Sequence, residues 1–405
     1  MNVVFLTMAR IVDIKSAGIY TDLLRKFRDD GHVVYIVTPF ERKFKKRSAM
    51  EFCDGVYILG VKTLNLQKTN AIEKGIGQLL LEYQYENAIK RYLSNVTFDL
   101  ILYSTPPITF NRVIEKLKTK NEKAISYLLL KDIFPQNAVD LGMISNKSLI
   151  YRLFRSKEKK LYEISDYIGC MSRANVDYVL THNSFIDHSK VEINPNSLSI
   201  SFTNKVKNID KEFIRKKYKL PIDKPIIIYG GKLGKPQGID FLIDILNANK
   251  NRNDCFFLIV GSGTEYNKLF NWCVQNNPGN TQLFNSLPKK DYESLAASCD
   301  IGLILLDKRF TIPNYPSRLL SYLSNKMPIL VASDINTDVG LDAENNGYGY
   351  FSESGDIISF NENLDKLLFS ADKRRDMGIC GYKYMCENFS IDRSYSVILK
   401  HFQNV

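Results

Sequence analysis

The stretch from Ile226 to Ile243, IIIYGGKLGKPQGIDFLI, decides the fold of its half of the chain. Three isoleucines and Tyr229 predict a β-strand that ends at Tyr229, and Gly230 and Gly231 then allow a tight turn. Apolar residues next recur at helical spacing, beginning near Gly238. A strand, a glycine turn and a helix in this order are typical of parallel α/β sheets, which bind ligands at the carboxyl edge of the strands.

The same turn also carries charge. Lys232 and Lys235 place two cations on it, close to the expected start of the helix. Glycines, cations and a helix N-terminus together favour a site for a phosphate group. The alternative is an ordinary strand-to-helix turn with incidental lysines.

Strands and helices alternate through both halves of the chain. Predicted strands in the front half are NVVFLT, HVVYIVTP, DLILYST, AISYLLL and DYIGCMS, and those in the back half are PIIIYGG, DCFFLIVGSG, CDIGLILL and MPILVAS. Their near-continuous apolar runs indicate strands buried on both faces. We therefore predict an α/β protein with two Rossmann-like, doubly wound parallel sheets that face a central cleft.

Two further turns lie in the back half. VGSGTE, residues 260–265, is a second strand-to-helix glycine turn that includes Gly261, but Tyr266 stands where a third glycine of a dinucleotide motif would be. In NYPSRLLSYLSNKMPIL, Pro316 and Ser317 predict a helix start, and Arg318 lies in its first turn, where an anion is favoured. Three such turns at one sheet edge strengthen the phosphate-site interpretation.

Composition limits the class of protein. The chain has 405 residues, of which 44% are apolar, and seven cysteines without a CxxC pair. This cysteine usage is typical of a reduced compartment. The first residues, MNVVFLTMAR, predict a strand rather than a signal peptide, and no apolar run approaches the ~20 residues that cross a bilayer. We expect a cytoplasmic protein whose membrane contact is peripheral.

Positive charge is concentrated in the front half. Residues 1–200 hold 29 basic against 21 acidic residues, within a net charge of +11 for the chain. The densest segment is FERKFKKRSAMEF, residues 40–52; a second, RLFRSKEKKLY, spans residues 152–162. Cations beside exposed aromatic residues, here Phe40 and Phe44, suit an anionic membrane surface, although a solvated loop and a solvated helix face are the simpler alternative. No nucleic-acid-binding module is visible, so nucleic acid is not an expected partner. The predicted membrane-contacting residues are Arg42, Lys43, Lys45, Lys46 and Arg47.

Taken in order, the motifs of the chain resemble a known family. The back-half stretches YGGKLGKPQGIDFLI, FLIVGSGTEYNKL, LPKKDYESLAASCDIGLILL and PSRLLSYLSNKMPILVAS are similar to the nucleotide-sugar-binding half of family-4 retaining glycosyltransferases with the GT-B fold. In the front half, SAGIYTDLLRKFRDDGHVVYIVT, LLLKDIFPQNAVDLGMI, SDYIGCMSRANVDYVL and VEINPNS resemble the acceptor half, especially in the capsule and O-antigen (WbuB-like) branch. The resemblance covers nearly the whole chain.

The resemblance implies roles for particular residues. Lys232, Ser317 and Arg318 match positions that meet the donor phosphates, and Asp132 and Gly18 match positions near the reacting sugar. We therefore predict Asp132, Lys232 and Arg318 as catalytic. Lys235 would replace a lysine that many members have where this chain has Gln237. The predicted donor-binding residues are Gly18, Gly231, Lys235, Gln237, Gly261, Ser317 and Ser321.

The chain also departs from the family pattern. The family's two glutamates eight positions apart are replaced by Pro313 and Ser321, so the contact to the donor ribose lacks its usual carboxylate. No metal-ligand cluster is visible, and the resemblance implies a metal-independent transfer without a cofactor. In this mechanism the cations stabilise the departing diphosphate. Two alternatives stay open, namely a nucleotide-sugar epimerase of the same fold and a non-catalytic nucleotide-sugar-binding protein.

The resemblance sets the expected organisation and partners. We predict an acceptor-binding domain at 1–200, a linker at 201–220, a nucleotide-sugar-binding domain at 221–388 and a C-terminal helix at 389–405 that packs back on the first domain. The expected donor is a UDP-linked N-acetylated or 6-deoxy sugar, and the expected acceptor is a saccharide on polyprenyl diphosphate. The enzyme would work at the inner face of the cytoplasmic membrane.

Overall fold

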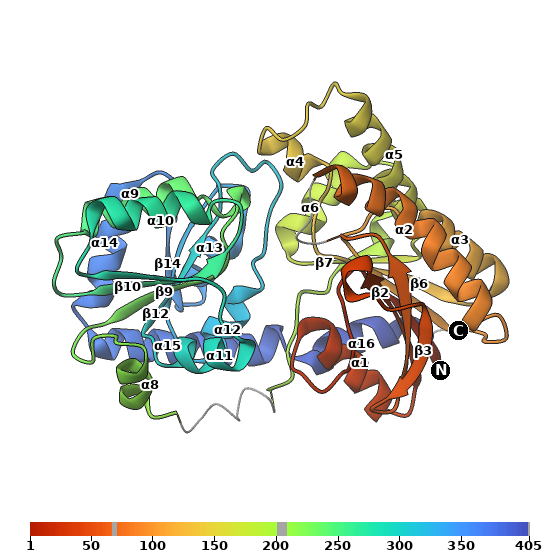
Figure 1. The fold of residues 1–405 in the computed structure, drawn as a ribbon, viewed down its shortest axis with the longest axis horizontal. Coiled ribbons are helices and arrows are strands. Elements are labelled where there is room, and N and C mark those ends of the chain that lie inside the picture. The colour runs from red at the N-terminus through yellow and green to blue at the C-terminus, as the bar shows by residue number, and fades with distance from the viewer. Residues whose placement is uncertain (67–70, 201–208, 404–405) are drawn as a thin grey trace. The chain divides into compact units, whose positions relative to one another are not determined.

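The computed structural model describes residues 1–66, 71–200 and 209–403, which form two compact units (Figure 1). Unit 1 comprises Met1–Leu198 together with Ile391–Val405, and unit 2 comprises Ser199–Ser390. Each unit is built on one sheet with helices on its faces. The chain thus leaves unit 1 once and returns to it at its C-terminal end.

Unit 1 contains an eight-stranded sheet in the order β3-β4-β2-β1-β5-β6-β7-β8. Its strands are β1 (Asn2–Leu6), β2 (Val33–Glu41), β3 (Ala49–Cys53), β4 (Val56–Thr63), β5 (Leu100–Ser104), β6 (Ile125–Leu130), β7 (Tyr167–Cys170) and β8 (Val191–Ile193). All neighbouring strands are parallel except β3 and β4. Central β5 is buried along its whole length, as expected for a strand covered on both faces.

The helices of unit 1 include one from the C-terminal end of the chain. They are α1 (Ile19–Asp29), α2 (Ala71–Tyr92), α3 (Asn111–Lys120), α4 (Gln136–Asp140), α5 (Leu149–Ile164), α6 (Arg173–His182) and α16 (Ile391–Leu399). Helix α16 packs against α1, where the ring centroids of Tyr395 and Phe27 lie 4.8 Å apart. Ile391 and Ile398 join the same apolar core. The core of unit 1 therefore includes the last helix of the chain.

Unit 2 contains a six-stranded, all-parallel sheet in the order β11-β10-β9-β12-β13-β14. Its strands are β9 (Ile226–Lys232), β10 (Phe256–Ser262), β11 (Thr281–Phe284), β12 (Ile301–Leu305), β13 (Ile329–Ser333) and β14 (Gly349–Glu353). Its helices are α8 (Lys211–Lys217), α9 (Ile239–Asn249), α10 (Tyr266–Asn276), α11 (Lys289–Ala297), α12 (Arg318–Ser324), α13 (Val339–Asn345), α14 (Ile357–Leu368) and α15 (Ala371–Asn388). This strand order is that of a doubly wound sheet.

Several details differ from the sequence-based expectation. Strand β9 does not end at Tyr229 but continues to Lys232, because Gly230 and Gly231 keep their pairing with β10. Of the predicted linker 201–220, residues 201–208 lie outside the described residues. Helix α8 in the remainder packs on α11, and Arg215 forms a 2.6 Å ion pair with Asp300. The described residues 209–220 therefore group with unit 2.

The structure also contains elements that the sequence analysis did not predict, among them α2, β3, β4, β11 and β14. The hairpin between β3 and β4 turns at Asp54 and Gly55, whose φ angles are 54° and 79°. Asp-Gly is a favoured pair for such a turn. Within the described ranges, every helix is too short or too polar to span a bilayer.

Candidate functional site

The candidate site lies where the strand order of unit 2 reverses. Strands β9 and β12 are neighbours at the centre of the sheet, and the helices that follow them, α9 and α12, leave in different directions along the sheet. A crevice outside the carboxyl ends of two such strands is the usual ligand position in doubly wound sheets. A ligand is therefore expected beside the residues after β9 and the start of α12.

Two glycines at the end of β9 make room for side chains from other elements. A Cβ atom on Gly230 would lie 2.0 Å from the hydroxyl oxygen of Tyr292 on α11. Gly231 has a φ of 131°, which favours glycine, and its α-carbon faces the Arg318 guanidinium, with the Nη2 atom 3.4 Å from an ideal Cβ. The glycines thus admit Tyr292 and Arg318, a role that the sequence analysis did not foresee.

Arg318 is the central cation of this site. Its guanidinium carbon lies 4.3 Å from the centre of the Tyr229 ring, a cation–π geometry. The Nη1 atom is buried and has no hydrogen-bond partner. Arg318 is thus half-buried, with its guanidinium against the Tyr229 ring.

The surroundings of Arg318 affect its ionisation. Burial opposes its charge, but the neighbouring tyrosine hydroxyls, that of Tyr229 first, raise the pKa of the guanidinium above its ordinary value. Because an arginine stays protonated in proteins, the site keeps a permanent positive charge. A buried donor without a partner costs free energy, which an anion bound at Nη1 would recover.

The hydroxyls of two tyrosines fix the backbone around Arg318. The Tyr322 hydroxyl accepts a 3.0 Å hydrogen bond from the Gly230 backbone N–H, and the Tyr229 hydroxyl donates a 2.9 Å bond to the Lys232 carbonyl. Burial raises the pKa of Tyr292 to about 12, so its hydroxyl is neutral at physiological pH. The sequence analysis missed Tyr229, Tyr292 and Tyr322 as site residues. The three tyrosines could have been noticed, because each lies within one of the motifs quoted above and combines an apolar ring with a hydroxyl group.

The two lysines of the turn after β9 lie at the surface of unit 2. Lys232 and Lys235 are both exposed, and the Lys232 side chain passes 3.7 Å from the ideal Cβ position of Gly234. Gln237 has a structural bond, because its Oε1 accepts a 3.2 Å hydrogen bond from the Gly234 backbone N–H. Helix α9 then begins after Gly238, which has a φ of 56°.

The remaining predicted residues of unit 2 surround this turn at different depths. A Cβ on Gly261 would lie 1.9 Å from the Gly231 carbonyl oxygen, so Gly261 allows the two strand ends to approach closely. Ser317 is exposed at the N-cap of α12 without a side-chain cap bond, and Ser321 is half-buried one turn further along. The structure thus brings Gly231, Lys232, Gly261 and Arg318 to one edge of the unit 2 sheet.

Asp132 and Gly18, the two predicted sugar contacts, belong to unit 1. Asp132 follows β6, and its Oδ1 accepts a 2.8 Å hydrogen bond from Asn137. Gly18 precedes α1 and donates its backbone N–H to Asp22 at 2.9 Å. Beside Asp132, Lys131 donates from Nζ to the Asn194 carbonyl at 3.1 Å, and burial lowers the pKa of Lys131 to about 7. The sequence analysis did not single out Lys131.

The basic segment 42–47 is only partly available for membrane contact. Phe40, expected as an exposed aromatic residue, is 3% exposed, because it lies in β2 and pairs with β4. Arg42 forms a 3.1 Å ion pair with Glu73, and Lys43 forms a 2.9 Å ion pair with Glu41. Phe44 is 36% exposed, with the Arg10 guanidinium 3.8 Å from its ring centre. The expectation of two exposed aromatics beside free cations is therefore corrected for Phe40.

No group of three His, Cys, Asp or Glu side chains in the described ranges is placed so that it could hold a metal ion.

The fold is shared with solved glycosyltransferase structures. Sucrose-phosphate synthase from Thermosynechococcus elongatus superposes with a TM-score of 0.76 and 14% identity, over 99% of this chain and 98% of that one. HepE from Anabaena, solved in complex with UDP, gives a TM-score of 0.69 and 12% identity over 100% of both chains. With its two parallel-sheet units of eight and six strands, the protein has the GT-B fold, as predicted.

Sequence comparison adds the family of one region. Residues 210–384, within unit 2, match the family described as Glycosyl transferases group 1. WbjE of Pseudomonas aeruginosa, named as a glycosyltransferase, is 21% identical over 304 residues, 74% of this chain and 73% of WbjE. WcaI of Escherichia coli (strain K12), named as a glycosyl transferase of colanic acid biosynthesis, is 27% identical over 150 residues, 36% of each chain. Residues 210–384 are thus similar to group 1 glycosyltransferases.

Proposed function

We propose that the protein is a retaining, metal-independent glycosyltransferase that moves a sugar from a nucleotide-sugar donor to a saccharide acceptor. The observation that carries this proposal is Arg318. It is a permanent cation held against Tyr229 beside the end of β9, and its buried Nη1 atom has no partner. The match of residues 210–384 to a glycosyltransferase family supports the same reaction class.

The chemistry follows from charge. The bond between the anomeric carbon of the sugar and the terminal phosphate oxygen of the donor breaks, and the departing nucleoside diphosphate gains negative charge. Arg318 and the exposed Lys232 stabilise that charge. An acceptor hydroxyl attacks the same face of the sugar, and the departing phosphate oxygen takes the hydroxyl proton, so no protein nucleophile is required.

The other predicted residues have supporting roles in this proposal. Lys235 adds positive charge to the turn, and the exposed Ser317 hydroxyl lies beside the amides at the start of α12. Ser321 stands where the family places the ribose-binding carboxylate and offers a hydroxyl instead. Asp132 and Gly18 stay predicted contacts of the reacting sugar, with Asp132 already oriented by Asn137.

We also propose the donor, the acceptor and the location. The UDP complex of HepE supports a UDP-linked donor, and the name of WcaI supports a role in bacterial surface polysaccharide biosynthesis. The acceptor is then a saccharide on polyprenyl diphosphate, as in capsule and O-antigen assembly. Since such a lipid stays in the bilayer, the enzyme works as a peripheral protein at the inner face of the cytoplasmic membrane.

Ligand-induced thermal stabilisation tests the donor site. UDP, GDP and their sugar conjugates are added separately to the full chain and to Arg318→Met. We expect one nucleotide to stabilise the wild type, by ~2.7 kcal/mol at 100 times its dissociation constant, and to lose most of this effect in the variant. Equal stabilisation of both proteins would contradict the assignment of Arg318.

A transfer assay with the nucleotide sugar that binds then distinguishes the reaction classes. Sugar transfer to a lipid-linked acceptor with retained configuration supports the proposal. Isomerisation of the donor without an acceptor would instead show an epimerase. Binding without turnover across a panel of acceptors would show a nucleotide-sugar-binding protein.

A further inference from the structure

Helix α2 of unit 1 exposes a continuous apolar stripe. Ile76, Leu79, Leu80 and Tyr83 are 49%, 49%, 43% and 57% exposed. Their spacing of three, four and seven residues places them on one face of the helix. Four large apolar side chains in two helical turns form a patch rather than scattered surface residues, and such patches mark interaction sites.

The N-terminal end of α5 exposes a second apolar group. Leu149, Ile150 and Leu153 are 80%, 56% and 47% exposed, and Met143 just before the helix is 63% exposed. The other side of the same helix is anchored in unit 1, where Leu161 and Tyr162 are fully covered. The N-terminal end of α5 therefore exposes apolar side chains, whereas the C-terminal part of the helix buries its apolar side chains in unit 1.

The contacts of α3 place the two apolar groups in the same region. On one side of α3, Glu86 of α2 pairs with both Arg112 and Lys116. On its other side, Glu115 pairs with Lys160 of α5 at 2.9 Å. One turn earlier on α3, the Arg112 backbone N–H donates to Glu82 of α2, and Asn111 donates to the Lys157 carbonyl of α5 at 2.7 Å. Residue numbers therefore rise in the same direction along all three helices, which run parallel.

A direct contact aligns the two outer helices. Lys157 of α5 reaches Glu82 of α2 at 3.3 Å. Leu153 lies one turn before Lys157, and Leu79 lies about one turn before Glu82, so both apolar groups precede this contact at a similar level. We call Ile76, Leu79, Leu80, Leu149, Ile150 and Leu153 the apolar surface.

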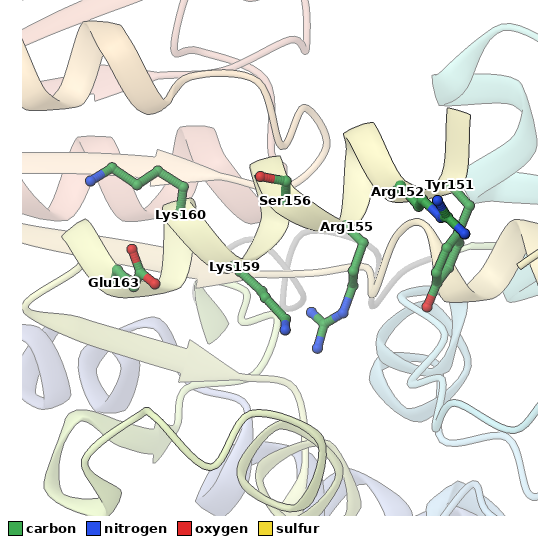
Figure 2. A pocket seen from close by; sticks show the side chains of 7 residues that line it. All are labelled: Tyr151, Arg152, Arg155, Ser156, Lys159, Lys160 and Glu163. Atoms are coloured by element: carbon green, nitrogen blue, oxygen red, sulfur yellow. The ribbon is translucent and has the colours of Figure 1, made fainter. Parts of the chain in front are cut away.

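Positive charge borders the apolar surface on α5. This helix contains five Lys or Arg residues and two Glu residues, a formal charge of +3. Arg152, Arg155 and Lys159 recur at three- and four-residue spacing and line one hollow along the helix. Figure 2 shows Arg155 and Lys159 extending from the same side of α5. Arg152 and Lys159 are exposed, whereas Arg155 is paired with Glu158 at 2.6 Å.

We propose that the apolar surface, together with the basic side of α5, docks unit 1 on an anionic lipid bilayer. Apolar side chains enter the boundary between headgroups and acyl chains, and the neighbouring cations attract acidic headgroups. The combination of exposed leucines and isoleucines with a net positive helix fits a lipid surface better than a neutral protein partner. The inference rests on one part of the proposed function, namely that the acceptor is linked to a lipid.

This surface differs from the basic segment 42–47. In that segment Phe40 is buried and Arg42 and Lys43 are paired with acids, so it offers charge with few insertable side chains. On α5, exposed apolar residues and exposed cations lie on one helix. Vesicle binding through the two surfaces should therefore depend differently on salt. Salt screens the attraction between cations and acidic headgroups but does not weaken the insertion of apolar side chains.

Vesicle co-sedimentation of the full chain tests the proposal. Vesicles of phosphatidylcholine with and without phosphatidylglycerol are mixed with the wild type, with Leu149→Ser/Ile150→Ser/Leu153→Ser and with Arg152→Gln/Lys159→Gln. We expect the apolar variant to bind at least tenfold more weakly at every salt concentration. We expect the charge variant to bind about 30-fold more weakly to acidic vesicles at low salt, since each cation contributes about fivefold, and to resemble the wild type at 1 M salt.

Matched variants in unit 2 serve as controls. Ile358→Ser/Phe369→Ser removes side chains that are 72% and 79% exposed, and Arg375→Gln/Lys383→Gln removes two exposed cations. Both controls should bind vesicles like the wild type. Circular dichroism melts check that each variant folds, which is expected because the substituted side chains are largely exposed.

Four results would overturn the proposal. The first is wild-type vesicle binding by the apolar variant, and the second is an equal loss in a unit 2 control. The third is loss of binding only when Arg42, Lys43, Lys45, Lys46 and Arg47 are changed to Gln, which would assign docking to the basic segment. Conversion of a dimer to a monomer by the apolar variant with unchanged vesicle binding would assign the surface to a second copy. None of these measurements uses sugar transfer, so their failure is distinct from failure of the proposed reaction.

Discussion

Each unit holds a half-buried cation near the carboxyl edge of its sheet, and the two cations have different surroundings. In unit 2, Arg318 lies over the Tyr229 ring with its Nη1 atom unpartnered. In unit 1, Lys131 donates to one backbone carbonyl, that of Asn194, and burial lowers its pKa to about 7. Lys131 directly follows strand β6, and Arg318 is the first residue of helix α12.

The difference lies in what each side chain can do when it is desolvated. An arginine stays charged, so burial under tyrosines produces a fixed positive site that is completed by an anion. A lysine can lose its proton instead, so Lys131 can become neutral when no anion is present. A donor diphosphate site needs the first kind of cation, and we expect the variants below to affect the two positions in different ways.

Loss of Arg318 should have the largest effect. We expect Arg318→Met to lower turnover by ~10²–10³, because one group that stabilises a developing oxyanion is removed. Arg318→Lys should recover part of the rate, since a point charge replaces a planar fork that can hold two phosphate oxygens. Steady-state kinetics measure both variants.

Thermal unfolding of the same variants supplies the control. Both should stay folded, because Arg318 forms no ion pair among the described contacts and Met can occupy the space over Tyr229. A folded Arg318→Met protein with near-normal turnover would remove Arg318 from the proposed site.

The sequence predicted part of this site and missed the rest for physical reasons. The strand, turn and helix around Gly231 follow from local apolar periodicity and glycine, and Arg318 was placed at a helix start from Pro316 and Ser317 alone. Its burial depends on Tyr292, which packs against Gly230 through the tertiary fold. No local pattern records that contact.

Two other differences have local causes. Phe40 was taken as exposed because it adjoins the basic segment, yet β2 extends to Glu41 and buries it. The hairpin turn at Asp54 and Gly55 had a recognisable Asp-Gly signal that the sequence analysis did not use. The fold class was thus predictable from strand alternation, whereas side-chain exposure at strand ends was not.

Lys232 should matter less than Arg318 because it is exposed. We expect Lys232→Ala to lower turnover by about 10², at the lower end for one oxyanion-stabilising group, with a change in unfolding free energy within ~0.5 kcal/mol. Turnover and urea unfolding are measured on the same preparation. Lys250→Ala, which changes another exposed lysine of unit 2, is the matched control. A decrease in unfolding free energy as large as the increase in activation free energy would show a structural role for Lys232 instead.

Lys131 should show its burial through stability. Its folded-state pKa of about 7 lies below the 10.5 of an ordinary lysine, so the unfolded chain binds more protons between these two pH values. The stability of the wild type should therefore rise with pH across this window. Lys131→Met removes the cost of desolvating the ammonium group and should be more stable at pH 7, by on the order of 1 kcal/mol.

The pH dependence of that difference provides the check. Urea unfolding at pH 7 and pH 9.5 should show the advantage of Lys131→Met shrinking as pH rises, because folding of the wild type releases the Lys131 proton and this release costs less free energy at higher pH. Lys123→Met, at an exposed position, should show no such trend. An advantage that is constant with pH would indicate better apolar packing rather than relief of a buried charge.

Removal of divalent metal should have the smallest effect. If Arg318 and Lys232 carry the charge of the departing diphosphate, EDTA should change turnover by less than about twofold, since no metal is needed to stabilise the leaving group. Added magnesium sharpens the test. If a metal ion took part in the reaction, it would bind the diphosphate, replace part of the charge missing in Arg318→Met and raise the turnover of this variant. We expect magnesium to leave both the wild type and this variant unchanged. Loss of wild-type activity in EDTA with recovery in magnesium or manganese would transfer the charge-stabilising role from the fixed arginine to a metal ion.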